Sequence, residues 1–152
     1  MTGFSSFEPL LRRVMKLLPS EPEILEWGPG FSTGIMVQER PRALIDTVEH
    51  DEYWFNVYKQ KYADFSNIRI HYVPDFPEYW VRPTRLGKTF DLIFVDGTER
   101  IECLKVAYQL VKKGGWVMLH DSERLEYHNG VKLFKVLHEE GDTTAMIRSE
   151  YP

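Results

Sequence analysis

The most constraining feature of the chain is a strand, a glycine turn and a helix that follow one another directly between residues 23 and 38. The apolar run at residues 23–27 ends at Gly28-Pro29-Gly30, and Ser32-Thr33 then begins a helical stretch. Glycine lets the backbone pass close to a ligand, and the first N–H groups of a helix are free to bind an anion. This arrangement is typical of a parallel sheet that binds a ligand beyond the end of its first strand.

Apolar runs and helical patterns alternate along the rest of the chain. We expect further strands at residues 43–50, 68–73, 90–97, 116–121 and 143–149. We expect the main helices at residues 7–19, 52–63, 100–111 and 131–140. The alternation predicts an α/β fold with a doubly wound, mostly parallel sheet and helices on both faces. Residues 74–89 fit neither period, and we expect them to form one long functional loop.

Composition and charge limit the partners and the cellular compartment that we expect for the protein. The net charge of −4 argues against a general affinity for nucleic acid, because that affinity depends on Lys and Arg neutralising phosphates. Cys103 is the single cysteine, which fits a reducing compartment. The sequence has neither an apolar run of about 20 residues nor a signal-peptide pattern at its start. We therefore expect one cytoplasmic domain spanning residues 1–152, without membrane contact.

Residues that could bind a ligand, most of them polar or glycine, stand at or just after the end of each of the first five predicted strands. Because ligands bind at the carboxyl ends of parallel strands, these residues are the candidates for a site. In chain order they are Glu26, Gly28, Gly30, Glu49, His50, Asp75, Phe76, Asp96, Gly97, His120 and Asp121.

Charge at the glycine turn separates two classes of ligand. Glu26 stands directly before the turn and would repel a pyrophosphate, and Thr33 replaces the third glycine of the dinucleotide pattern GxGxxG. S-adenosylmethionine has no phosphate and carries an ammonium and a sulfonium, so Glu26 would favour its cationic end. Glu49 ends the second strand 23 residues later, where an acidic side chain can accept both hydroxyls of an adenosine ribose.

With the segments EWGPGFSTG, TVEHDEYW, FDLIFVDG and KKGGWVMLHDSER, the chain resembles the class I S-adenosylmethionine-dependent methyltransferases over residues 23–125. Ser32 stands where that family often has a third glycine. The resemblance implies that Glu49 binds ribose, that Asp75 and Phe76 lie near adenine, and that Asp96 faces the methionine end or the acceptor. The residues expected to bind the cofactor are Glu26, Gly28, Gly30, Ser32, Thr33, Glu49, His50, Asp75, Phe76, Asp96 and Gly97.

Methyl transfer to a hydroxyl also needs a base, and His120 is the preferred candidate, with Asp96 and Asp121 as the others. Some O-methyltransferases of this family hold a divalent cation at positions that match Asp96 and Asp121. Here Ser122 replaces the asparagine expected beside them, so a Mg²⁺ site is an option and not the main expectation. In the alternative interpretation, His120 is a satisfied histidine beside the core, and Asp96-Gly97 is a plain turn.

Three classes of function remain open from the sequence. The leading hypothesis is a methyltransferase acting on a small molecule or sugar. The alternatives are another enzyme of the same fold, such as an aminopropyl transferase or an NAD-dependent oxidoreductase, and a non-catalytic cofactor-binding module. The pattern contains six strand candidates, whereas class I methyltransferases usually have seven strands. We therefore expect a sheet shortened at its C-terminal end and a homodimer that covers the exposed edge.

Overall fold

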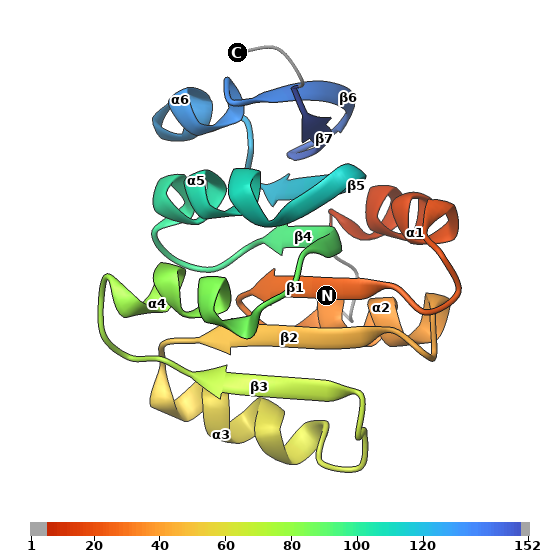
Figure 1. Ribbon diagram of the computed structural model, residues 1–152, viewed down its shortest axis with the longest axis vertical. Coiled ribbons are helices and arrows are strands. Elements are labelled where there is room, and N and C mark those ends of the chain that lie inside the picture. The colour runs from red at the N-terminus through yellow and green to blue at the C-terminus, as the bar shows by residue number, and fades with distance from the viewer. Residues whose placement is uncertain (1–5, 150–152) are drawn as a thin grey trace.

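The computed structural model describes residues 6–149. Within them, seven strands form one sheet in the order β3-β2-β1-β4-β5-β7-β6 (Figure 1). The strands are β1 (Glu23–Trp27), β2 (Leu44–Glu49), β3 (Ile68–Tyr72), β4 (Phe90–Val95), β5 (Val111–His120), β6 (Phe134–Glu140) and β7 (Thr143–Arg148). Strands β1 to β5 pair in parallel, whereas β7 pairs antiparallel with both β5 and β6. The predicted α/β fold with a mostly parallel sheet is confirmed.

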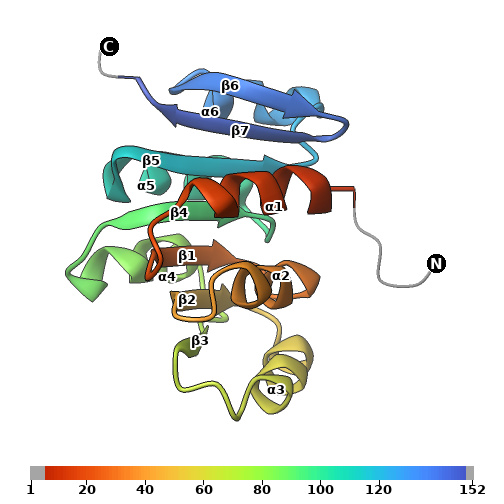
Figure 2. The same cartoon turned by 90° about the vertical axis from the view of Figure 1, so that its right-hand side faces the viewer.

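Helices cover both faces of this sheet, as predicted (Figures 1 and 2). One face carries α1 (Glu8–Leu17), α2 (Phe31–Glu39) and α3 (Glu52–Lys61). The other face carries α4 (Glu78–Val81), α5 (Arg100–Leu110) and α6 (His128–Val131). Short 3-10 helices at Arg82–Leu86 and Leu125–Tyr127 complete the described elements.

Two apolar cores result from the alternation of side chains along the central strands. Ile24, Leu92 and Phe94 point toward α1 and α2, and all three are fully buried. Their neighbours Leu25 and Ile93 point to the opposite face, where they pack with α5. Because successive side chains of a strand face opposite sides, an unbroken apolar run is what a sheet covered on both faces requires.

The helix expected at residues 131–140 is wrong, because most of this segment is strand β6. Its apolar residues also fit a helical period, which produced the error. Gly141, at φ +61°, connects β6 to β7 in a tight hairpin. With β6 the sheet has seven strands within the described residues, so the expectation of a sheet shortened at its C-terminal end is also wrong.

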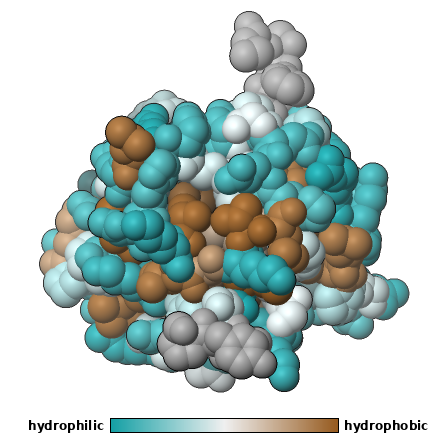
Figure 3. Space-filling model, turned by 90° about the horizontal axis from the view of Figure 1, so that it is seen from above, coloured by the Kyte–Doolittle hydropathy of each residue, from teal (hydrophilic) through white to brown (hydrophobic). Residues whose placement is uncertain are grey.

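Strand β6 lies at the edge of the sheet and pairs with β7 on one side. Leu133, Val136 and Leu137 are 36–40% exposed there. A view from this side shows hydrophobic side chains among hydrophilic ones (Figure 3). Because the sheet has seven strands, a missing strand can no longer be an argument for a homodimer. The homodimer stays a prediction, and it now depends on the exposed edge of β6.

Residues 74–89 contain more regular structure than the expected loop. They form α4 and the 3-10 helix Arg82–Leu86, and Tyr79 from α4 is fully buried against the second core. Their proposed role in function stays a prediction. None of the helices described between residues 6 and 149 could span a lipid bilayer.

Candidate functional site

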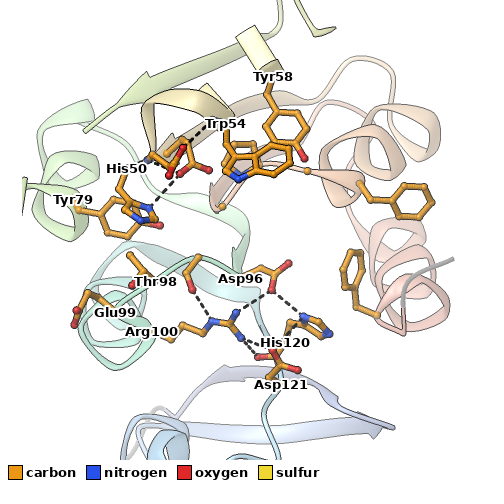
Figure 4. Close-up of a pocket in the computed structure, with 18 of the residues that line it drawn as sticks. His50, Trp54, Tyr58, Tyr79, Asp96, Thr98, Glu99, Arg100, His120 and Asp121 are labelled. Carbon is orange, nitrogen blue, oxygen red and sulfur yellow. Dashed lines mark hydrogen bonds and ion pairs between the residues drawn. The ribbon is translucent and has the colours of Figure 1, made fainter. Parts of the chain in front are cut away.

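A pocket of about 820 Å³ lies beyond the carboxyl ends of β1, β2, β4 and β5. The residues after these strands line it, together with side chains from α3, α4 and α5 (Figure 4). The pocket therefore occupies the edge of the sheet at which the sequence placed the candidate residues.

Two glycines form the floor of this pocket by bringing two loops into backbone contact. Gly28 has φ +90°, and a Cβ placed there would lie 2.7 Å from the carbonyl oxygen of Asp96. A Cβ on Gly97 would collide with the hydroxyl of Tyr79. Both positions need glycine for the close approach, so the turns after β1 and β4 are built as one unit.

Glu26 lies beneath the glycine turn and is fully buried. Its carboxylate accepts hydrogen bonds from the hydroxyls of Ser32 and Thr33, the latter at 2.6 Å between Oγ1 and Oε1. Burial raises the pKa of Glu26 to about 7, and the two hydroxyl bonds offset only part of this effect. None of these three residues lines the pocket, so their role in cofactor binding stays a prediction.

Glu49 presents a carboxylate at the end of β2. Its Oε2 accepts the backbone N–H of Asp51 at 2.8 Å and lies 3.2 Å from Nδ1 of His50. Within the described residues, Oε1 of Glu49 takes part in no hydrogen bond, and the residue lines the pocket. A fixed carboxylate with one oxygen available is suited to bind hydroxyl groups.

Aromatic side chains form the wall beside Glu49. Trp54 stacks on Tyr58 with ring centroids 5.8 Å apart, and Tyr79 meets His50 edge to face at 5.6 Å. Figure 4 shows these four side chains around one part of the pocket. A flat heterocycle could pack against such a wall.

His120 ends β5 and is bonded through both ring nitrogens. Nδ1 lies 2.9 Å from Oδ1 of Asp96, and Nε2 lies 3.1 Å from the hydroxyl of Ser6 and 3.3 Å from Oδ2 of Asp142. Burial lowers the pKa of His120, but the bond to Asp96 and the nearby carboxylates outweigh it and raise the pKa. The Phe7 ring packs edge to face on the imidazole at 5.1 Å. The geometry is that of an oriented imidazole at the pocket wall.

Arg100 lies between the carboxylates that follow β4 and β5. Its Nη1 is 3.2 Å from Oδ2 of Asp121, and its Nη2 is 3.4 Å from Oδ1 of Asp96. Its Nε also donates to the carbonyl of Gly97 at 2.7 Å, and Nη1 donates to the carbonyl of His120 at 2.6 Å. The guanidinium thereby joins the ends of both strands.

The structure brings most of the predicted residues to the pocket. Those that line it are Gly28, Gly30, Glu49, His50, Asp96, Gly97, His120 and Asp121. Asp75 is exposed and does not line it. Phe76 is 46% exposed and contacts the lining residues His50 and Tyr79, so it lies at the margin.

Sequence reasoning missed several lining residues, chiefly Arg100 and Tyr79. Arg100 is the first residue of α5 and stands four residues after Asp96. This spacing of opposite charges was the available signal for an ion pair between them. No such signal pointed to Tyr79, because its helix α4 lies in a segment that was expected to be a loop.

Comparison with known proteins supports the fold. Neither a protein-family model nor a curated protein matches the sequence. A solved methyltransferase-like protein from Silicibacter pomeroyi is similar with a TM-score of 0.76 and 21% identity, over 100% of this chain and 90% of that one. A candidate caffeoyl-CoA O-methyltransferase from Staphylococcus aureus is similar with a TM-score of 0.73 and 16% identity, over 96% and 84%.

The methyltransferase MycE of the mycinamycin pathway, solved with Mg and S-adenosylhomocysteine (SAH), has a TM-score of 0.67 and 16% identity. The match covers 94% of this chain and 46% of MycE. Identities of this size show the fold. The chain therefore has the fold of the class I S-adenosylmethionine-dependent methyltransferases, and the resemblance predicted from its motifs is confirmed at that level.

Proposed function

We propose that the protein is an S-adenosylmethionine-dependent methyltransferase that transfers a methyl group to a small molecule or sugar. The observation that carries this proposal is the Glu49 carboxylate, which lines the pocket at the end of β2 and has one oxygen available. The Gly28 turn lines the same pocket at the end of β1. A ribose on Glu49 and a methionine moiety beside the turn would fit this arrangement.

Charge favours a sulfonium cofactor over a dinucleotide. Acidic lining residues are Glu49, Asp51, Asp96, Glu99 and Asp121, whereas the basic lining residues are Arg100 and Arg124, apart from histidines. Both arginines already contact Asp121. A pyrophosphate would meet net negative charge, whereas the sulfonium and ammonium of S-adenosylmethionine would be attracted to it.

The enzyme would act mainly by alignment. Displacement at the methyl carbon needs the acceptor atom and the sulfonium in line, and fixed orientation supplies much of the acceleration. For a hydroxyl acceptor, His120 in its neutral form would take the proton at Nε2 while Asp96 accepts from Nδ1. Because the pKa of His120 is raised, this neutral form becomes more abundant as the pH rises. The acceptor oxygen would take the place that the Ser6 hydroxyl occupies 3.1 Å from Nε2.

Calorimetry with SAH and with NAD tests the proposal. SAH should bind in preference to NAD, and Glu49→Ala should weaken SAH binding by about 1–3 kcal/mol, because charged hydrogen bonds are lost. Glu52→Gln is the matched control, since it removes a nearby carboxylate that does not line the pocket. Equal affinity for NAD, or SAH binding that Glu49→Ala leaves unchanged, would contradict the proposal and favour the oxidoreductase alternative or a different site.

The same proposal holds that three segments select the methyl acceptor: residues 74–89, helix α1 and residues 122–129. Arg124 and Tyr127 from the last of these segments line the pocket, as does Tyr79 from the first.

A homodimer would form at the β6 edge, and light scattering should then give about twice the chain mass of 18.0 kDa. A monomeric particle would remove the dimer from the proposal.

A further inference from the structure

The carboxylates at the ends of β4 and β5 form a group that could attract a divalent cation. Ligand atoms of His120, Asp121 and Asp142 lie within 4.8 Å of one another, and Asp96 bonds to the same histidine. Carboxylates and imidazole are common metal ligands. Whether a metal binds depends on the cations that the protein itself places there.

The protein already places one fixed cation between two of these carboxylates. The Arg100 guanidinium lies 3.2 Å from Asp121 and 3.4 Å from Asp96, and Figure 4 shows it between them. Its side chain is 13% exposed, and its guanidinium packs over the Tyr127 ring at 5.5 Å. Donation to the carbonyls of Gly97 and His120 fixes it further. These contacts hold it from several directions, unlike a surface arginine that a metal could displace.

The remaining groups are also satisfied by protein partners. Asp142 accepts the hydroxyl of Ser6 at 2.7 Å and that of Thr143 at 2.9 Å. Arg124 lies 3.5 Å from Asp121 but is 53% exposed, so it contributes less than Arg100. A divalent cation entering here would have to approach the guanidinium closely, and like charges repel strongly in a partly buried site.

We propose that Arg100 is a resident cation that takes the place of a divalent metal between Asp96 and Asp121, so that the pocket works without one. The residues present therefore do not fit the metal that the fold family allows at these positions. Arg100 would fix the two carboxylates by charge and by directed hydrogen bonds. In this role it is a positioning residue for Asp96 and, through Asp96, for His120.

Direct measurement of Mn²⁺ binding tests this inference without any assay of methyl transfer. The protein is freed of metal with a chelator and titrated with Mn²⁺, and free Mn²⁺ is followed by electron paramagnetic resonance. Wild type and Arg100→Lys should bind Mn²⁺ weakly, whereas Arg100→Ala should bind it about tenfold tighter or more, because the competing charge is gone. Arg100→Met, which keeps the aliphatic stem over Tyr127, serves the same purpose if the alanine variant does not fold.

Two controls make the result specific. Arg124→Ala removes the exposed partner of Asp121 and should not create a site. Asp121→Asn added to Arg100→Ala should abolish the gained binding. The inference is overturned if wild type binds Mn²⁺ tightly through Asp121, or if both neutral Arg100 variants bind no better than wild type. SAH binding that Glu49→Ala leaves unchanged would contradict the proposed function but would not affect the Mn²⁺ result, so the two proposals fail separately.

Discussion

Gly28→Ala tests the backbone contact that forms the pocket floor. Gly28 has φ +90°, and the added methyl group would lie 2.7 Å from the carbonyl oxygen of Asp96 and 2.9 Å from Cα of Gly97. Both atoms belong to backbone, so neither can move aside as a flexible side chain would. The turn after β1 or the turn after β4 has to shift.

The magnitude follows from two separate costs. A left-handed backbone costs an alanine about 1–2 kcal/mol, and overpacking adds about 1–3 kcal/mol. Gly28→Ala should therefore lower the free energy of unfolding by about 2–5 kcal/mol. Gly114 has φ +79° with open space around it, so Gly114→Ala should show the first cost alone. Gly30 has extended backbone and an ordinary contact with Tyr58, so Gly30→Ala should change stability by less than about 1 kcal/mol.

Urea unfolding followed by circular dichroism measures the three variants, with the midpoints compared at a common slope. SAH affinity is measured on the same samples, and Gly28→Ala should lose it. A Gly28→Ala variant no less stable than Gly114→Ala would refute the contact between the two turns.

Three further predictions concern titratable groups. Glu26 has a pKa raised by burial to about 7, so its ionisation opposes folding. The contribution of Glu26 to stability should be fully present below about pH 4.5 and should fall by about 3 kcal/mol as the pH rises to about 7; Glu26→Gln should remove this fall in urea unfolding at several pH values. Burial favours a raised pKa for Asp46, but bonds to His71 and Lys88 outweigh it and lower the pKa to about 2. The resulting stabilisation of about 2 kcal/mol should be complete above about pH 4 and lost toward pH 2, and the Asp46→Asn variant should lack this pH dependence. His120 should titrate above the usual value of about 6.5 in an NMR experiment, and Asp96→Asn should lower its pKa; an unchanged value would show that the carboxylate does not hold the imidazole.

The central part of the fold could be predicted from sequence because its strands are buried on both faces. Runs such as residues 90–95 are apolar at every position but one, and they leave no alternative to a covered strand. The C-terminal hairpin could not be predicted in this way. Strand β6 has one buried residue, Phe134, and its remaining pattern also fits a helix.

Some residues of the site could likewise be predicted from the sequence, and others could not. Gly28, Glu49 and Asp96 were predictable because each lies at the end of a strong strand signal or directly after it. Asp142 was not, since it reaches His120 only because β7 inserts between β5 and β6. Glu26 was expected to face the cofactor, but it is buried beneath the turn, where the hydroxyls of Ser32 and Thr33 bond to it; the spacing alone did not reveal these bonds.

A crystal structure of the protein with SAH is the most direct test of the proposed cofactor site. We expect density for the ligand beyond the ends of β1, β2 and β4, with both ribose hydroxyls on Glu49 and the methionine moiety over the Gly28 turn. Ligand density at another place, or a ribose that makes no contact with Glu49, would show that this site is wrong.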